Sequence, residues 1–486
     1  MKRILLFISV VLVSLVFVVF LKTTGFKSKQ LSVKPAPGIA IDTKRAVENL
    51  AKAIQFKTIS NQDPSKFDYQ QFKDLHAFLE ELFPNVHRKL RKELVNEYSL
   101  LYTWEGTAPE LKPMLLMAHM DVVPIEPGTE NKWNYPPFAG RIAEGYIWGR
   151  GALDDKASLM GILEAAEFLL AEGYLPRRTI YLAFGHDEEV GGTNGAAKIA
   201  EILESRGVQL EYVLDEGGAI IKGVVPGLSE PAALVGIAEK GYLSVELVVA
   251  GQGGHSSMPP PHTTVGILST AIHHLERNQF GKQITGGTKQ MFEHLGPHMP
   301  FALRMLFANP WLFGKLIKSE LAQSPPSNSL IRTTIAATML EGSPKENVLP
   351  REAKAVINFR ILPGDTIDGI VAHVRKAIND ERVRIRVLGK GRSPSAVSDV
   401  NSASYGVLAR SILQIFPDVV VAPFLVVGGT DSRHYEEVSE NIYRFLPIRL
   451  VSEDYGRLHG TNERIAVENY TEIIRFYLQL IRNFNR

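Results

Sequence analysis

Apolar and polar residues follow two rhythms along this chain, and from residue 45 onward the two alternate. Stretches with apolar residues at helical spacing are separated by short runs that are apolar throughout. The helical spacing predicts helices over 44–56, 69–82, 156–171 and 467–481, and the short runs predict strands over 114–118, 179–184, 211–214 and 423–427. Wholly apolar strands that alternate with helices are typical of a parallel sheet covered by helices.

Between about 240 and 395 the pattern changes. The expected elements are, in order, a strand over 241–249, a helix over 262–277, strands over 328–340 and 353–362, a helix over 366–379 and a strand over 382–388. This βαββαβ order is that of the ferredoxin-like unit. We therefore expect an α/β domain in two parts, 45–238 and 397–486, interrupted by a smaller α+β domain over 239–396.

A segment over 281–327 within the smaller domain is rich in Phe, Met, Leu, Pro and Trp. It carries Phe292, Met299, Phe301, Leu303, Met305, Leu306, Phe307, Trp311 and Phe313. These side chains suit an apolar pocket, a membrane contact, or an additional core or dimer surface.

The N-terminus carries 18 uncharged, mostly apolar residues from Ile4 to Leu21, between Arg3 and Lys22. As a helix they span about 27 Å at ~1.5 Å per residue, close to the hydrocarbon thickness of a bilayer. We expect residues 1–22 to be a single-pass membrane anchor, residues 23–44 to be a linker, and the rest to be extracytoplasmic. A signal peptide, and hence secretion, is the alternative.

Charge and cysteine content narrow the chemistry of the 486-residue chain. Lys and Arg total 54 against 52 Asp and Glu, a net charge of +2, which argues against a nucleic-acid partner. There is no cysteine, which excludes disulfides, cysteine-ligated metals and thiol catalysis. Gly-x-Ser-x-Gly and His-Glu-x-x-His motifs do not occur either. Any metal must be held by His, Asp and Glu.

Such residues stand where three predicted strands end. His119 and Asp121 follow the first run, Glu188 and Glu189 the second, and Asp215 and Glu216 the third. Ligands of open α/β sheets bind outside the carboxyl ends of the strands, so we expect these side chains to converge. Further candidates are Asp154 and Asp155, just before a helix, and His459, just before the last helix.

Carboxylates gathered at one sheet edge repel one another. Each close pair costs about 4 kcal/mol at ~4 Å and an effective dielectric near 20. A pair of divalent cations relieves this repulsion, and mixed imidazole and carboxylate donors suit Zn²⁺, with Co²⁺ or Mn²⁺ as substitutes. In a two-metal hydrolytic site, one residue of an adjacent Glu-Glu pair can bind metal while the other acts as general base.

These motifs, in this order, resemble the di-zinc peptidase family of aminoacylase, carboxypeptidase S, glutamate carboxypeptidase and acetylornithine deacetylase. The motifs are His119-x-Asp121, Gly151-x-x-Asp154-Asp155-Lys156, Glu188-Glu189, Asp215 and His459. Residues 237–242 and the 281–327 segment look most like carboxypeptidase S and its relatives that make and cleave N-fatty-acyl amino acids. The fold implied is an α/β, phosphorylase/hydrolase-like zinc-peptidase catalytic domain with an inserted ferredoxin-like lid and dimerisation domain.

The resemblance implies a role for each site residue. Two Zn²⁺ ions would be held by His119, Asp154, Glu189, Asp215 and His459, with Asp154 bridging them; the pairing of the other ligands stays open. Asp121 would orient His119, and Glu188 would be the general base. In this family the peptide that corresponds to Asp154–Asp155 can be cis.

The inserted domain would contribute substrate contacts. The resemblance implies that His255 reaches the active site of a second copy, and that Asn347 and Arg360 contact the substrate. Arg360 would hold a substrate carboxylate. Gly429 and Thr430, in a loop that follows a strand, would lie against the substrate.

We therefore expect a zinc-dependent hydrolase of an amide or peptide bond next to a free carboxylate, either a carboxypeptidase or an N-acyl-amino-acid amidohydrolase. One alternative is an aminopeptidase with the same metal cluster, which would not need Arg360. The other is a non-catalytic, receptor-like homologue without metals.

Overall fold

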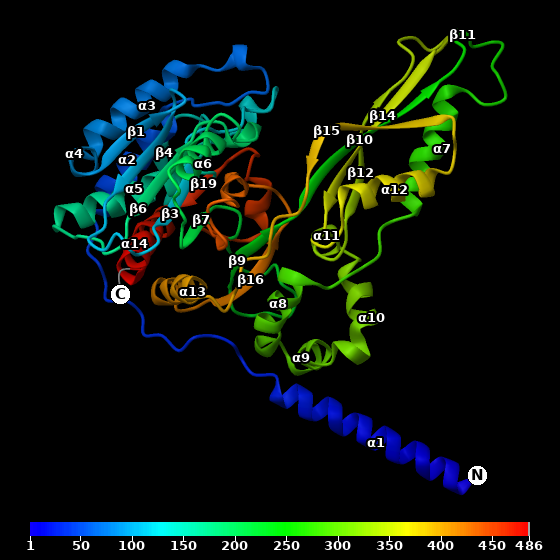
Figure 1. Cartoon of the computed structure of the whole chain (residues 1–486), viewed down its shortest axis with the longest axis horizontal. Coiled ribbons are helices and arrows are strands. Elements are labelled where there is room, and N and C mark those ends of the chain that lie inside the picture. The colour runs from blue at the N-terminus through cyan, green and yellow to red at the C-terminus, as the bar shows by residue number, and fades with distance from the viewer. Residues whose placement is uncertain (485–486) are drawn as a thin grey trace.

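The computed structural model describes residues 1–484, and its larger part is built on a mixed β-sheet (Figure 1). Within the described chain this sheet has ten strands. Nine lie in the order β1 (Arg91–Val95), β2 (Ser99–Trp104), β6 (Ile180–Gly185), β3 (Met114–His119), β7 (Tyr212–Asp215), β17 (Ile442–Arg444), β9 (Ala232–Glu239), β8 (Ile220–Ile221) and β18 (Arg449–Leu450), and β16 (Val420–Val426) also pairs with β9.

The strands expected from the apolar runs are β3, β6, β7 and β16. β3 runs parallel to both β6 and β7, and β16 runs parallel to β9. Alternate residues of β3 join different cores, since Leu116 packs on one face of the sheet and Leu115 on the other. Both faces are covered by helices, which is why these strands are apolar throughout.

Helices of the larger part flank the sheet. They are α2 (Thr43–Gln55), α3 (Tyr69–Leu82), α4 (Pro84–Lys89), α5 (Lys156–Ala171), α6 (Ala196–Ser205), α13 (Ala403–Ile415) and α14 (Val467–Phe484). α6 contributes to the core on one face, and α5 packs against α14 on the other. A small sheet of β4 (Arg141–Ala143), β5 (Tyr146–Trp148) and β19 (Arg464–Ala466) lies beside them.

The chain between β9 and β16 builds a second sheet with its own core. Its strands are β12 (Thr334–Glu341), β14 (Glu352–Ile361), β10 (Gly241–Ala250) and β15 (Val383–Arg392), in that spatial order, and α7 (Thr264–Arg277) and α12 (Ile367–Ile378) cover one face. This is the ferredoxin-like arrangement that the βαββαβ order predicts. A short ribbon of β11 (Gly254–His255) and β13 (Val348–Leu349) lies at its far end (Figure 1).

The apolar segment over 281–327 folds as helices. They are α8 (Gly286–Leu295), α9 (Phe301–Ala308), α10 (Pro310–Leu321) and α11 (Pro325–Ser329). The strand expected over 328–340 is wrong at its start: Pro325 begins α11, and β12 begins only at Thr334. Proline suits the first turn of a helix, and it shifts this boundary by six residues.

At the N-terminus, α1 (Lys2–Gly25) extends away from the rest of the chain, and it is long and apolar enough to cross a membrane (Figure 1). The segment after it has no regular structure but is not a free linker. The Gln30 side chain exchanges two 2.8 Å hydrogen bonds with the backbone of Val421, and the Ala36 N–H donates to the Gln414 carbonyl.

Candidate metal centre

Three neighbouring parallel strands, β6, β3 and β7, end at the same edge of the main sheet. His119 is the last residue of β3, and Glu216 directly follows β7. Glu188 and Glu189 begin the 3-10 turn η3 (Glu188–Val190), three residues beyond β6. The convergence expected from the sequence is therefore present.

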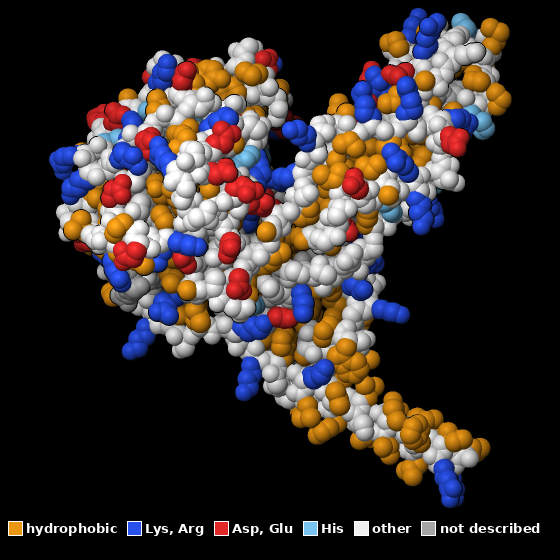
Figure 2. Space-filling view, in the orientation of Figure 1, with side chains coloured by type: hydrophobic (Ala, Val, Ile, Leu, Met, Phe, Trp, Pro, Cys, Tyr) orange, Lys and Arg blue, Asp and Glu red, His pale blue; other side chains and the backbone are white. Residues whose placement is uncertain are grey.

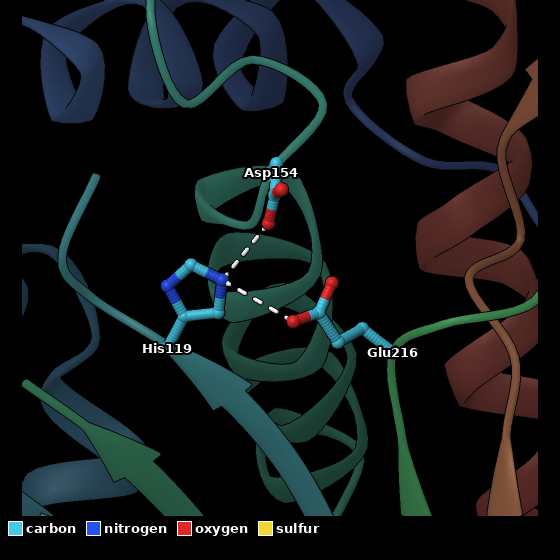
Figure 3. A group of neighbouring side chains, drawn as sticks. All are labelled: His119, Asp154 and Glu216. Carbon is cyan, nitrogen blue, oxygen red and sulfur yellow. Dashed lines mark hydrogen bonds and ion pairs between the residues drawn. The ribbon is translucent and has the colours of Figure 1, made fainter. Parts of the chain in front are cut away.

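His119, Asp154 and Glu216 form one group of side chains (Figure 3). His119 Nε2 lies 2.9 Å from Asp154 Oδ1 and 3.6 Å from Glu216 Oε1, so both carboxylates point at the same ring nitrogen. His119 and Asp154 are buried, and Glu216 is nearly so.

A second group shares Asp154 with the first. His459 Nε2 lies 2.9 Å from Asp154 Oδ2 and 3.3 Å from Glu189 Oε1. Asp154 thus offers one oxygen to each group, which is the arrangement of a carboxylate that bridges two cations. The Asp154–Asp155 peptide is cis.

Asp121 holds two parts of the centre together. Nδ1 of His119, the ring nitrogen that faces away from Asp154, lies 2.9 Å from the backbone carbonyl of Asp121 and 3.3 Å from its Oδ1. The same carboxylate accepts 3.1 Å hydrogen bonds from the backbone N–H groups of Glu188 and Glu189. Asp121 therefore orients the imidazole through its backbone carbonyl and its carboxylate, and the carboxylate also fixes the Glu188–Glu189 turn.

A buried ion pair that the sequence analysis did not single out fixes Asp154 and His459. Arg150 Nη1 lies 2.6 Å from Glu463 Oε2, and Arg150 Nη2 donates to the backbone carbonyl of His459. Glu463 Oε1 accepts hydrogen bonds from the backbone N–H groups of Leu153 and Asp154. The pair ties the loop before α5 to the loop before β19.

The charges of the centre favour cations. Burial lowers the pKa of His119, but hydrogen bonds to Asp121 and Asp154 outweigh it and hold this pKa well above its usual value. The hydrogen bond to Asp154, followed by the Glu189 carboxylate 3.3 Å away, raises the pKa of His459 to about 10. Burial, and then the nearby Asp154 carboxylate, raise the pKa of Glu216.

The donor set fits divalent metal ions. Each group offers one imidazole nitrogen and two carboxylate oxygens, with the ligand atoms within 4.8 Å of one another. Within the described chain, Glu189 Oε1 is buried and has no hydrogen bond, although it faces His459. A buried carboxylate oxygen without a hydrogen bond is costly, and a cation shared with Asp154 would satisfy it.

Asp215, the fifth predicted ligand, belongs to neither group in the described chain. Its Oδ2 instead accepts a 2.7 Å hydrogen bond from the backbone N–H of Ser432. The structure brings the next residue, Glu216, against His119, because successive residues at a strand end point to opposite sides. The Asp215-Glu216 pair contained this information, but alternation alone does not tell which carboxylate faces the histidine.

The loop with Gly429 and Thr430 lies over a charged network. Thr430 donates its N–H and its hydroxyl to Glu239 Oε1, which also pairs with the buried Arg444 at 2.7 Å. A Cβ on Gly429 would lie 2.2 Å from Nη2 of Arg392, so only glycine lets the guanidinium approach the backbone here. The loop is held in place from beneath.

Other arginines lie close to Arg392 in this region. Burial lowers the pKa of Arg392, Glu239 at 3.5 Å opposes this shift, and the charges of Arg433 and Arg360 lower the pKa further. Arg433 bridges the Thr430 and Gly191 carbonyls and so ties the loop to the turn after Glu189. Glu239 pairs with Arg444 at 2.7 Å and with Arg392 at 3.5 Å, so one carboxylate serves two guanidinium groups and the cluster keeps excess positive charge.

The other predicted substrate residues lie on the second sheet. Arg360, on β14, places its guanidinium 5.1 Å from the centre of the Tyr242 ring. His255 and Asn347 sit together at the far end, where the Ser256 N–H donates to the Asn347 carbonyl. His255 is exposed, and its contact is with Ser257 rather than with the metal centre.

The chain is similar to known proteins over most of its length. A probable carboxypeptidase S-like protein of Dictyostelium discoideum is 43% identical over 482 residues, 97% of this chain and 92% of its own length. An N-fatty-acyl-amino acid synthase/hydrolase, PM20D1.1, of Danio rerio is 41% identical over 90% of this chain and 85% of its own length.

A crystal structure of an M20 family metallo-carboxypeptidase from Sulfolobus solfataricus has the same fold. Its TM-score is 0.66 at 19% identity, and the match covers 90% of this chain and 99% of that one. The model of Peptidase family M20/M25/M40 matches residues 115–483, the greater part of the sequence. The chain belongs to this peptidase family.

Proposed function

We propose that the chain is a two-zinc hydrolase that cleaves an amide bond next to a free carboxylate, with N-acyl amino acids as its substrate class. That it is a metal-dependent amide hydrolase follows from its family and from the ligand groups around Asp154. The finer assignment draws on relatives described as carboxypeptidase S-like and as N-fatty-acyl-amino acid synthase/hydrolase.

The metal ligands in this proposal are His119 and Glu216 for one ion, His459 and Glu189 for the other, and Asp154 for both. Glu216 replaces Asp215 because it faces His119. Bound divalent cations polarise an amide carbonyl and acidify a water molecule.

Glu188 moves the proton in this proposal. Its backbone is fixed by Asp121, and burial, followed by the charge of Asp431, raises the pKa of its side chain. A carboxylate with a raised pKa can take a proton from the attacking water and then donate it to the leaving amine near neutral pH.

The single observation behind the carboxylate preference is the arginine cluster. The charge of Arg360 lowers the pKa of Arg392, and Glu239 is shared between Arg444 at 2.7 Å and Arg392 at 3.5 Å, so the three guanidinium groups outnumber the one carboxylate. A substrate carboxylate between the guanidinium groups of Arg360 and Arg392 would relieve their repulsion and accept hydrogen bonds from both. An aminopeptidase would instead need a free carboxylate here to hold the substrate amine.

Arg360→Ala tests this assignment. We expect KM for an N-acyl amino acid to rise by about 10–100-fold, the loss of a charge-assisted hydrogen bond worth about 1.5–3 kcal/mol. The corresponding N-acyl amino-acid amide, which lacks the carboxylate, should be cleaved equally by both proteins. Arg384→Ala, at an exposed position of β15, is the matched control. An unchanged KM in Arg360→Ala would favour the aminopeptidase.

Two assembly proposals accompany this function. α1 is proposed as an uncleaved anchor that holds an extracytoplasmic enzyme on the membrane, with a secreted, cleaved form as the alternative. His255 is proposed to act in a second copy of the chain. Its exposed position at the far end of the second sheet supports this role.

A further inference from the structure

The helices of the 281–327 segment are not explained by the metal centre. α8 packs against β16 of the main sheet, and a Cβ on Gly287 would lie 3.2 Å from the backbone of Phe424. α9 and α10 continue outward from α8 and meet the end of α1 (Figure 1). This group is therefore fixed to the catalytic part of the chain and also contacts the N-terminal helix.

The contact with α1 is specific. Asn309, buried at the junction of α9 and α10, donates from Nδ2 to the Val19 carbonyl at 3.3 Å and to Thr23 Oγ1 at 3.2 Å. Val19 and Thr23 are the buried residues of α1. Arg304 on α9 donates a 2.8 Å hydrogen bond to the carbonyl of Phe26, just beyond the helix.

The contact between Asn309 and α1 determines how deep α9 and α10 lie in a bilayer that α1 spans. Val19 belongs to the uncharged run that ends at Leu21, and Lys22 is the first charge after it. At ~1.5 Å per residue, Val19 lies about 4.5 Å to the apolar side of Lys22. If α1 spans a bilayer, Asn309 reaches below the level at which the hydrocarbon begins, and the neighbouring turns of α9 and α10 reach that level with it.

The outer surface of these turns is apolar. Phe301, Trp311, Leu312 and Leu316 are 58%, 53%, 41% and 46% exposed, whereas Ile317 on the opposite side of α10 is buried. In the space-filling view the apolar side chains of α1 continue onto the surface at its base (Figure 2). Exposed apolar side chains that form a continuous surface mark an interaction site.

Its polar border suits a lipid headgroup layer. The Lys22 ammonium lies 5.3 Å from the centre of the Trp311 ring, and Trp311 Nε1 donates to Asn309 Oδ1. Lys315 and Lys318 follow on α10. Tryptophan and lysine are the residues that populate the boundary between hydrocarbon and headgroups.

We propose that the outer surface of α9 and α10, namely Phe301, Trp311, Leu312 and Leu316, is embedded in the headgroup boundary of the membrane that α1 spans. This inference rests on the proposed anchor. Because α8 packs on β16, the embedded surface holds the catalytic sheet at a fixed orientation to the bilayer. The enzyme then contacts the membrane at two places, α1 and the outer surface of α9 and α10, and is not held by α1 and a flexible linker alone.

Absence of native cysteine makes the test direct. A spin label is attached to Leu316→Cys, or to Leu94→Cys on β1 as the matched exposed control, in the full chain reconstituted into phosphatidylcholine–phosphatidylglycerol vesicles. Oxygen concentrates in hydrocarbon and a nickel chelate stays in water. We expect the ratio of oxygen to nickel collision rates to be severalfold higher for the label on Leu316→Cys.

Equal ratios at the two positions would overturn the proposal. So would a label screened from both reagents and broadened by a second label, because that result would mean that another copy covers the surface. The mass of the purified chain shows separately whether the anchor is retained. Loss of α1 would contradict both the proposed anchor and the proposed embedding of α9 and α10. Both variants should hydrolyse a short, water-soluble N-acyl amino acid at the wild-type rate, so this inference can fail while the proposed function stands.

Discussion

At the scale of single residues, the candidate metal centre depends on neighbouring carboxylates that have different roles. Glu188 and Glu189 are adjacent, yet Glu189 faces His459 whereas the side chain of Glu188 is placed near Asp431. Asp121 fixes both through their backbone N–H groups. Substitution of Glu188 should therefore lower the rate of catalysis, and substitution of Glu189 should weaken metal binding.

Glu188→Gln is expected to lower kcat by roughly 10²–10⁴-fold, the usual contribution of a general base. The amide keeps the size of the side chain but cannot take up a proton. Steady-state kinetics together with elemental analysis of the purified protein checks this, since the zinc content should equal that of the wild type. A variant that turns over normally would show that another group moves the proton.

Metal binding is expected to release protons. The pKa of His459 is raised from 6.5 to about 10 and that of His119 is also well above its usual value, so both imidazoles are protonated at pH 7 in the metal-free chain. A ligating imidazole must be neutral, so zinc binding is expected to release protons and to be tighter at higher pH.

Folding of the metal-free chain follows the opposite trend. The raised pKa of His459 stabilises this form fully below about pH 6.5, and the contribution disappears as the pH rises toward 10.

Calorimetric zinc titrations in two buffers of different ionisation enthalpy count the protons that zinc binding releases. Identical heats in both buffers would contradict the charge state assigned here.

At the scale of elements, loops that are far apart in sequence are held by a few buried ion pairs. Arg150 and Glu463 join the loop before α5 to the loop before β19. Removal of one partner from a buried pair leaves an uncompensated charge, which costs about 3–5 kcal/mol.

Glu463→Gln is therefore expected to lower the melting temperature by several degrees and to weaken metal retention, because both Asp154 and His459 lose their support. Thermal unfolding followed by circular dichroism, with and without added zinc, measures this. Glu468→Gln, at an exposed position of α14, is the control and should unfold like the wild type. Equal stability of the two variants would mean that the Arg150–Glu463 pair does not stabilise the fold.

The sequence predicted elements better than the contacts between them. Apolar runs identified β3, β6, β7 and β16, and the βαββαβ order predicted the second sheet, because periodicity reports directly on burial. The choice between Asp215 and Glu216 depends on which side of a strand end faces His119. Arg392 and Glu463 carry no local signal either, since their partners lie far away in the sequence.

At the scale of the whole molecule, three parts of the chain meet around one function. The domain of the main sheet carries the proposed metal ligands, the second sheet carries Arg360, which is proposed to hold the substrate, and α1 with the 281–327 helices forms a continuous apolar surface (Figures 1 and 2). The contact between α1 and α9 was beyond sequence analysis, which could identify both segments as apolar but not as neighbours.

Two cations around one shared carboxylate form the centre of this account, and zinc content measures them most directly. Elemental analysis of the purified full chain should find about two zinc ions per chain, about one in His459→Ala and less than one in Asp154→Asn, with turnover lost in both variants. Full zinc content and normal turnover in either variant would contradict the two-metal centre.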